Sequence, residues 1–212
     1  MSILYNADLH TYTVVESGVV LPSITQIIDS TGFNAAMQDI PQHILRHAAD
    51  RGSVVHLLCH AYDTKQEVDL SAVDPGLIEE AQPYLAAYIE WRIKTGWKLL
   101  EAENPRGSED LGYGGTPDRI FEDHEGWRVI VEIKTSLKIS ATAHVQVAAQ
   151  EMLLCEIDRS KRIVLQLTKE GTYKEHVSDD PGLDLRIWHN ALENYQFMAA
   201  KKLLRRKSGG KP

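Results

Sequence analysis

Three charged residues, Asp118, Glu132 and Lys134, stand at a spacing that a β-hairpin would bring together. The intervening segment 124–126 ends in Gly126 and matches a three-residue hairpin loop with glycine in the left-handed position. Counting back from this turn sets Asp118 opposite Glu132, with Cβ atoms about 4.5–5.5 Å apart. Lys134 shares their face because strand side chains alternate with period two. Facing carboxylates repel each other unless a cation lies between them, so the spacing predicts a divalent-metal site beside a lysine.

The second strand of this hairpin has the alternation of a strand with one apolar face. The apolar face would carry Trp127, Val129, Val131 and Ile133, and the other face Arg128, Ile130, Glu132 and Lys134. The alternative interpretation is an exposed hairpin whose polar face merely holds charges.

Periodicity and turn residues predict the elements that must position these side chains. We expect a hairpin over 9–21, a short helix capped by Ser23, helices over 42–62 and 75–94, a strand over 97–102, the motif hairpin over 112–134, a helix over 141–155, strands over 162–167 and 173–177, and a long closing helix. This order suits an α/β fold with a mixed sheet flanked by helices. We expect a single domain over 1–207, with an N-terminal hairpin and helices (1–95), a core (97–177), a C-terminal helix (181–206) and a disordered tail at 208–212.

The composition is that of an ordinary globular chain. The 212 residues are 43% hydrophobic and 25% charged, enough for a sizeable core. The chain has no run of about 18 apolar residues and no signal-peptide start, so we expect a cytoplasmic protein without a membrane partner. Cys59 and Cys155 stand alone, which argues against a disulfide framework, structural zinc or a four-cysteine iron–sulfur cluster.

Pro117-Asp118 and Glu132-Ile133-Lys134 resemble the signature of the PD-(D/E)xK nuclease superfamily. The segment from Gly52 to His56 resembles the Gly-x-x-x-His element of its RecB-like and lambda-exonuclease-like branch, and Pro22-Ser23-Ile-Thr resembles an opening common in phage-encoded members. The resemblance covers roughly residues 50 to 170. It implies a restriction-endonuclease-like α/β core with a mixed central sheet flanked by helices.

The resemblance also implies a metal site and a catalytic lysine. Mg²⁺ or Mn²⁺ would be held by His56, Asp118, Glu132 and the Ile133 carbonyl. Lys134 would position or deprotonate the attacking water and offset developing charge.

Two histidines lie one turn apart in the same predicted helix. The alternative for His56 is a histidine at the edge of a packed helix face, although Gly52, one turn earlier, would let the helix approach the sheet closely. His60 lacks the metalloprotease pattern because Leu57 stands where glutamate would be required. We interpret His60 as solvent-facing or as a neighbour of the ligands.

Polar residues on either side of the motif are further candidates. Gln146 and Gln150 resemble a Gln-x-x-x-Tyr element of the same branch that helps to hold the site and the substrate phosphate, but Gln150 stands at the tyrosine position. Gln146 is therefore the stronger candidate, and the alternative is a polar helix face. Glu103 ends the preceding strand and could approach the metal. Glu101 shares its face, so the choice between the two acids stays open. The alternative is that these acids form a charged strand end that faces water.

Glycines and an arginine flank the motif. Gly112, Gly114 and Gly115 lack the Lys-Ser/Thr and the helix of a phosphate loop, so we interpret them as allowing a bend near a nucleic-acid backbone or tight packing. Arg119 follows Asp118 on the opposite face and is expected to form a salt bridge.

The net charge of −7 argues against a broad, non-specific coating of nucleic acid. The C-terminal end is nevertheless basic, with Lys201, Lys202, Arg205, Arg206, Lys207 and Lys211 and no acid. It would either contact a DNA backbone or form a solvated helix end whose cations complement the helix dipole.

The leading interpretation is a metal-dependent DNA nuclease, most simply an exonuclease of phage recombination or repair. Two alternatives stay open: a nuclease-fold module that binds DNA or a protein without cleavage, and a structure-specific endonuclease. DNA is the expected partner, and a recombination or single-strand-binding protein and a second copy of this chain are further candidates.

Overall fold

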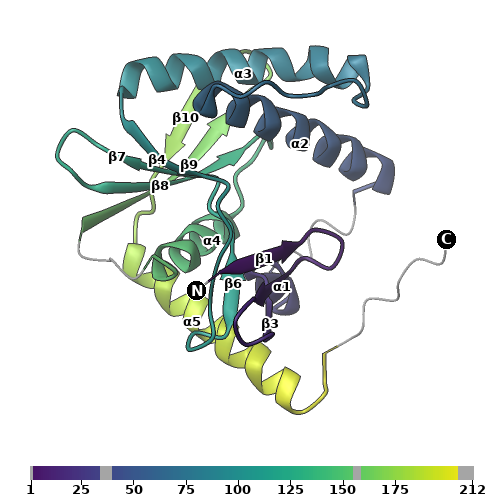
Figure 1. Cartoon of the computed structure of the whole chain (residues 1–212), viewed down its shortest axis with the longest axis vertical. Coiled ribbons are helices and arrows are strands. Elements are labelled where there is room, and N and C mark those ends of the chain that lie inside the picture. Colours follow the sequence, from purple (N-terminus) through teal and green to yellow (C-terminus); the bar gives the residue numbers. More distant parts are fainter. Residues whose placement is uncertain (1, 34–39, 155–158, 205–212) are drawn as a thin grey trace.

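The computed structural model describes residues 2–33, 40–154 and 159–204 (Figure 1). Its centre is a five-stranded sheet with the order β10-β9-β8-β7-β4. The strands are β4 (Lys98–Ala102), β7 (Arg119–Glu122), β8 (Arg128–Lys134), β9 (Ser160–Leu167) and β10 (Tyr173–His176). β8 and β9 are parallel, whereas the other three neighbouring pairs are antiparallel. The mixed sheet that the sequence predicts is confirmed.

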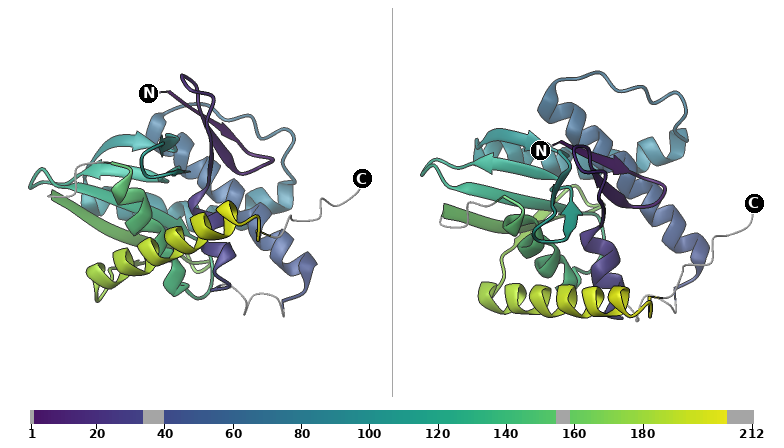
Figure 2. Two further views of the ribbon diagram at one scale, coloured as in Figure 1. Left: turned by 90° about the horizontal axis from the view of Figure 1, so that it is seen from below. Right: turned by 60° about the horizontal axis from the view of Figure 1, so that its bottom comes forward.

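Helices cover both faces of this sheet. α2 (Gln42–Thr64) and α3 (Pro75–Thr95) pack on one face and α4 (Ala141–Met152) on the other, with α1 (Ile24–Ser30) and α5 (Pro181–Ala200) packed beyond α4. Figures 1 and 2 show α3 and α5 on opposite sides of the molecule, with the sheet between them. This layering confirms the α/β fold class. No helix in the described part of the chain is long and apolar enough to cross a membrane.

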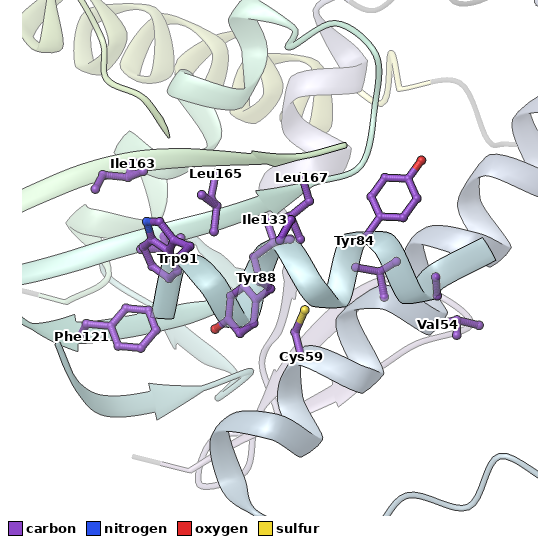
Figure 3. Packing of buried hydrophobic residues seen from close by; sticks show 14 of the residues in the cluster. Val54, Cys59, Tyr84, Tyr88, Trp91, Phe121, Ile133, Ile163, Leu165 and Leu167 are labelled. Carbon is purple, nitrogen blue, oxygen red and sulfur yellow. The ribbon is translucent and has the colours of Figure 1, made fainter. Parts of the chain in front are cut away.

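Large apolar side chains fill the space between α3 and the sheet (Figure 3). Trp91 is fully buried, with its ring centroid 5.6 Å from that of Phe121. Val129, Val131 and Ile133 belong to the same cluster, which confirms these three positions of the predicted apolar face. Trp127 precedes β8 and is not in the cluster. Full burial of each side chain in the cluster contributes about 1.5–3 kcal/mol. The opposite face of β8 is covered as well, because Ile130 packs against α4.

Two small sheets accompany the central one. β1 (Ile3–Asn6), β2 (Thr11–Val14) and β3 (Val20–Pro22) form one, and β5 (Arg106–Ser108) and β6 (Tyr113–Gly115) form the other. The predicted hairpin over 9–21 corresponds to β2 and β3, whereas neither β1 nor β5 was predicted from the sequence. A bridge between Ser23 and Gly114 connects the two sheets.

The predicted motif hairpin over 112–134 is too long. Its first part, β6, pairs with β5 rather than with β8. The hairpin proper begins at Arg119, directly after Pro117 and Asp118. Proline lacks the N–H that a continued ladder would need.

The predicted C-terminal helix over 181–206 is also too long, because α5 ends at Ala200. Lys202 adopts a left-handed φ of 56°, and the Leu203 N–H donates to the Met198 carbonyl at 2.8 Å. Together with the Lys202 N–H bond to the Ala199 carbonyl, this is a Schellman motif, which terminates a helix. Arg205, Arg206 and the predicted tail at 208–212 lie outside the described residues, as does Cys155 at the predicted end of α4.

Candidate active site

The β7–β8 hairpin brings Asp118 and Glu132 together. Gly126 adopts the left-handed conformation that the turn requires, with φ +78°. The register pairs Arg119 with Val131, so the next pair outward is Asp118 with Glu132, as predicted. Both carboxylates are buried, with exposures of 9% for Asp118 and 3% for Glu132.

Pro117 ends the ladder in a way that frees the Ile133 backbone. Hydrogen-bonded pairs alternate along an antiparallel ladder, so the next one would join Pro117 to Ile133. Pro117 has no N–H to donate to the Ile133 carbonyl, so that carbonyl is left without this ladder bond. The Ile133 N–H donates to Asp118 Oδ2 at 2.7 Å. Because the N–H and C=O of one strand residue point to the same edge, the Ile133 carbonyl faces the edge that carries the Asp118 carboxylate. This orientation fits the ligand role that the resemblance implies.

Three side chains hold Glu132. Lys134 Nζ and Gln146 Nε2 each donate to Glu132 Oε1 at 2.7 Å, and Gln150 Nε2 donates to Oε2 at 2.8 Å. The two glutamines lie one turn apart on α4, so both reach the sheet. Gln150, which stands at the tyrosine position of the resemblance, is the more deeply buried, at 1% exposed. Burial and the Asp118 charge raise the pKa of Glu132, against the opposing effect of Lys134 and Gln150.

His56 approaches Asp118 from α2. Its Nδ1 lies 3.4 Å from Asp118 Oδ1, and its side chain is 28% exposed. Burial lowers the pKa of His56, but the carboxylates of Asp118, Glu132 and Glu103 outweigh burial and raise this pKa to about 9. This shift favours the protonated ring in the metal-free protein, where it supplies a positive charge beside two carboxylates. Binding of a metal by the ring would require the proton to leave.

Gly52 does not have the expected steric role. A Cβ at this position would meet the Thr135 side chain at 3.6 Å, an ordinary van der Waals contact. The approach of α2 to the sheet therefore does not depend on a glycine there.

Opposite charges fix the ionisation of Asp118 and Lys134. Burial raises the pKa of Asp118, but His56, Lys134 and the Ile133 amide outweigh it, and the net shift is downward. Burial likewise lowers the pKa of Lys134, but Glu132 and Asp118 outweigh it and raise this pKa. Asp118 is therefore a carboxylate and Lys134 an ammonium at neutral pH.

Glu103, rather than Glu101, is directed toward the site. Glu101 accepts hydrogen bonds from Arg106 and Asn104, away from Asp118. The Glu103 N–H donates to the Asp118 carbonyl at 3.0 Å, and Glu103 Oε2 lies 3.9 Å from His60 Nδ1. The strand alternation that would put Glu101 and Glu103 on one face does not hold here. The register of β4 is irregular at Glu101. Glu103 itself adopts a left-handed φ of 49°. His60 is thus a neighbour of the site, contacting Glu103.

Arg119 ties these acids to α2 and forms the salt bridges expected of it. It is fully buried, and its Nε donates to Asp63 Oδ2 at 2.7 Å. One Nη donates to the Asp118 carbonyl at 2.6 Å and to Glu103 Oε1 at 3.2 Å. Sequence reasoning missed Asp63, although it continues the stripe of Gly52, His56 and His60 along one face of α2.

A cavity of about 790 Å³ opens over this cluster. Its described lining includes His56, Glu103, Asp118, Gln146 and Gln150. Glu132 and Lys134 are not part of the lining and connect to it through the two glutamines. The N-terminal sheet contributes three rings that sequence reasoning missed: Tyr5, His10 and Tyr12.

The donor set suits a hard divalent ion. Asp118, Glu132 and the Ile133 carbonyl offer oxygen atoms, and burying two carboxylates together is unfavourable without a nearby cation. Within the described residues, no three His, Cys, Asp or Glu side chains by themselves form a group that could hold a metal. Such an ion would therefore need the backbone carbonyl, water and substrate oxygens, which is how Mg²⁺ usually binds.

The two described basic residues that were predicted to contact DNA lie apart from the cavity. Lys201 and Lys202 are exposed at the end of α5 and do not line the cavity. Arg205 and Arg206 lie outside the described residues.

Gly114 and Gly115 are positions of tight packing. A Cβ on Gly114 would lie 2.4 Å from Tyr12 Cγ, and one on Gly115 would lie 2.3 Å from Ile24 Cδ1. Of the two interpretations, tight packing is the one that these contacts explain.

Comparison with protein families and with curated proteins finds no match. Among solved structures, the chain is similar to a protein named as an exonuclease from Eubacterium rectale, with 12% identity and a TM-score of 0.51, over 86% of this chain and 82% of that one. It also aligns with an alkaline exonuclease from Laribacter hongkongensis, with 17% identity and a TM-score of 0.36, over 82% and 93% of the two chains. The first similarity shows a shared α/β fold.

Proposed function

We propose that this protein is a metal-dependent nuclease that hydrolyses phosphodiester bonds in DNA. The observation that carries the proposal is the convergence of Asp118, Glu132, Lys134 and His56, from one hairpin and one helix, beside a single cavity. Burying two neighbouring carboxylates is costly for folding, and such strain concentrates at functional sites.

A metal ion and Lys134 would divide the chemistry. Mg²⁺ or Mn²⁺ would be held by Asp118, Glu132, His56 and the Ile133 carbonyl. When bound, the ion would act as a Lewis acid on the phosphate and would lower the pKa of a bound water. Lys134 is fixed by Glu132 at 2.7 Å and by Gln146 at 3.3 Å. Because its pKa is raised, we assign Lys134 to orienting the water and balancing developing negative charge rather than to accepting a proton.

We favour an exonuclease, working in phage recombination or repair. The support is the resemblance of the motifs and the exonuclease name of the structural neighbour from Eubacterium rectale. A structure-specific endonuclease would use the same chemistry and differs in whether a DNA end is needed.

One observation favours a second candidate, a nuclease-fold module that binds DNA without cleaving it. Both oxygens of Glu132 already accept hydrogen bonds, from Lys134, Gln146 and Gln150. A carboxylate held in this way has fewer lone pairs to offer an ion. The intact set of Asp118, Glu132 and Lys134 favours catalysis, since a binding module would not need it.

Digestion of end-labelled linear DNA and closed circular DNA tests these candidates. Each substrate is incubated with Mg²⁺, Mn²⁺ or EDTA. An exonuclease degrades the linear DNA in a metal-dependent manner and leaves the circle intact, whereas an endonuclease opens the circle. Binding without cleavage under every metal condition would exclude the nuclease proposal and support the binding module.

A further inference from the structure

One wall of the cavity consists of aromatic rings from the N-terminal sheet: Tyr5, His10 and Tyr12, here called the aromatic wall. The Tyr5 and Tyr12 ring centroids are 4.9 Å apart with the planes tilted by 34°, and the His10 centroid lies 6.5 Å from that of Tyr5. Tyr12 is buried at 5% exposure, whereas Tyr5 is 41% exposed. Tyr5 therefore has a supported side and a side open to solvent.

The aromatic wall is held to the segment that leads into Asp118. The Tyr12 hydroxyl lies 2.9 Å from Thr116 Oγ1, two residues before Asp118. The Tyr12 ring occupies the space where Gly114 lacks a Cβ. A side chain at position 114 would displace the Tyr12 ring. The glycine therefore allows the aromatic wall to pack next to the candidate active site.

The loop that carries His10 is held as well. The Leu9 N–H donates to Asn6 Oδ1 at 2.9 Å, and Gln26 of α1 donates to the Leu9 carbonyl at 2.8 Å. His10 has a left-handed φ of 50°, which is costly for a residue other than glycine, and its Nδ1 lies 3.0 Å from the Tyr5 hydroxyl. Strained backbone of this kind concentrates at ligand-binding positions.

The charge of the cavity limits what can bind there. The described lining contains no lysine or arginine. His56 is the lining residue that offers positive charge beside the acids, but it is paired with Asp118 at 3.4 Å, and Glu103 adds a second carboxylate. Proteins usually bind nucleic acid through cations on the phosphates. In this cavity that contribution is small, and stacking of bases on aromatic rings is the alternative source of affinity.

We propose that the aromatic wall, with the exposed side of Tyr5 as its contact surface, stacks a nucleobase of an unpaired strand whose phosphate lies at Asp118. This inference rests on the proposed nuclease function, because it places a substrate in the same site. A base inside a duplex is already stacked on both faces and must leave the helix to reach the ring. The substrate class is therefore single-stranded DNA, including a frayed or overhanging end.

Binding measurements with two matched strands test the stacking. One is a short single strand of mixed sequence, and the other has the same length and phosphates but abasic residues throughout. Both are titrated with Ca²⁺ in place of Mg²⁺. The wild type should bind the strand with bases more tightly. Tyr5→Ala should weaken that binding by about 5- to 150-fold, which corresponds to the 1–3 kcal/mol of one base–aromatic stack, and should leave binding of the abasic strand unchanged.

Three further variants separate stacking from folding. Tyr5→Phe keeps the ring and should bind like the wild type. Tyr5→Leu keeps apolar contact with Tyr12 but should lose the preference for bases. Leu4→Ala is the matched control, because Leu4 is on the same strand, is 63% exposed and does not line the cavity. An unchanged preference for bases in folded Tyr5→Leu would overturn the stacking proposal.

Cleavage assays with Mg²⁺ distinguish this proposal from the proposed function. Tyr5→Ala should raise KM for a single strand while kcat stays within a few-fold of wild type. If the wild type cleaves but neither KM nor base preference responds to Tyr5, the nuclease stands and the stacking proposal falls. If the wild type never cleaves but base preference depends on Tyr5, the stacking holds and the nuclease proposal falls. Tighter binding of a blunt duplex than of a single strand would overturn the assignment of an unpaired substrate.

Discussion

The Ile133 amide donates a 2.7 Å hydrogen bond to the Asp118 carboxylate at the point where β7 and β8 stop pairing. The side chain of Asp118 thereby takes the place of the backbone carbonyl that would accept from Ile133 if the ladder continued. A carboxylate held by the sheet backbone has few rotamers to lose when a ligand binds. The relationship explains how a short motif can position one of its acids without help from a distant element.

Removing the Lys134 amine tests whether it acts in the chemistry. Lys134→Ala should reduce the cleavage rate by at least about 100-fold, a barrier increase of about 2.7 kcal/mol, because developing charge loses its nearby cation. The measurement is single-turnover cleavage with Mg²⁺, with Lys138→Ala, an exposed lysine on the following loop, as the control. A rate within about tenfold of wild type would show that Lys134 is not catalytic.

Asp118→Asn tests the metal site. Asparagine can still accept the Ile133 N–H, so the fold should survive, but the anionic ligand is lost. Ligand at 100 times its Kd stabilises a protein by about 2.7 kcal/mol, and we expect the increase in Tm caused by Mn²⁺ to shrink strongly in the variant. Melting in EDTA and in Mn²⁺ gives the comparison, with the exposed Asp179→Asn as the control. An undiminished increase would exclude Asp118 as a ligand.

The ionisation of His56 should make the free energy of unfolding of the metal-free protein decrease as the pH becomes alkaline. Its folded pKa of about 9 lies above the ordinary value of 6.5, so its contribution is fully present below about pH 6.5 and is lost as pH rises through 9. At about 1.36 kcal/mol per pKa unit, the upper bound on this loss of unfolding free energy is about 3.4 kcal/mol, and the partial exposure of the ring reduces it. We expect His56→Gln to flatten the decline in unfolding free energy between these pH values, measured by urea denaturation in EDTA. Parallel curves for the two proteins would contradict the pairing with Asp118.

Cleavage by the same His56→Gln protein distinguishes a ligand from a packing residue. If the ring holds metal, Mn²⁺-supported activity should fall more than stability does. A variant that loses stability but keeps its specific activity in the folded fraction would assign His56 to packing.

Gln150 should matter more than Gln146. Gln150→Leu leaves a buried oxygen of Glu132 without its donor, which costs about 1–3 kcal/mol of unfolding free energy. Gln146→Leu should cost less, because the oxygen that it contacts also accepts from Lys134 and because Gln146 is half-buried. Denaturant unfolding of both variants gives the loss of unfolding free energy in each. A larger loss in Gln146→Leu than in Gln150→Leu would show that the burial of Gln150 does not determine how strongly it stabilises Glu132.

The basic end of the chain should act on affinity rather than on catalysis. Charge reversal of Lys201 and Lys202 should flatten the slope of log affinity against log salt by about 0.9 for each phosphate of duplex DNA that the protein no longer neutralises. Charge reversal of Arg205 and Arg206 is the companion test. An unchanged slope in both proteins would assign these cations to a solvated chain end.

Within single elements, the sequence determined side-chain direction. The loop ending at Gly126 and the alternation along β8 were enough to set Asp118 opposite Glu132 and to bury Ile133. The resemblance of their motifs, rather than the helical period, singled out His56 and Gln146, and both contact the acids of the hairpin. The inferences about the hairpin succeed because the direction of a side chain follows from backbone geometry alone.

Relations between distant elements were decided by the tertiary structure. An irregular strand and a left-handed residue turned Glu103, rather than Glu101, toward Asp118. Burial between α4 and the sheet gave Gln150 its contact with Glu132, and Tyr12 reached Thr116 across 104 positions of the chain. Such contacts depend on how whole elements pack, and packing is a collective property that no local spacing encodes. For this reason the motif was visible in the sequence, whereas the aromatic wall beside it became visible through the fold.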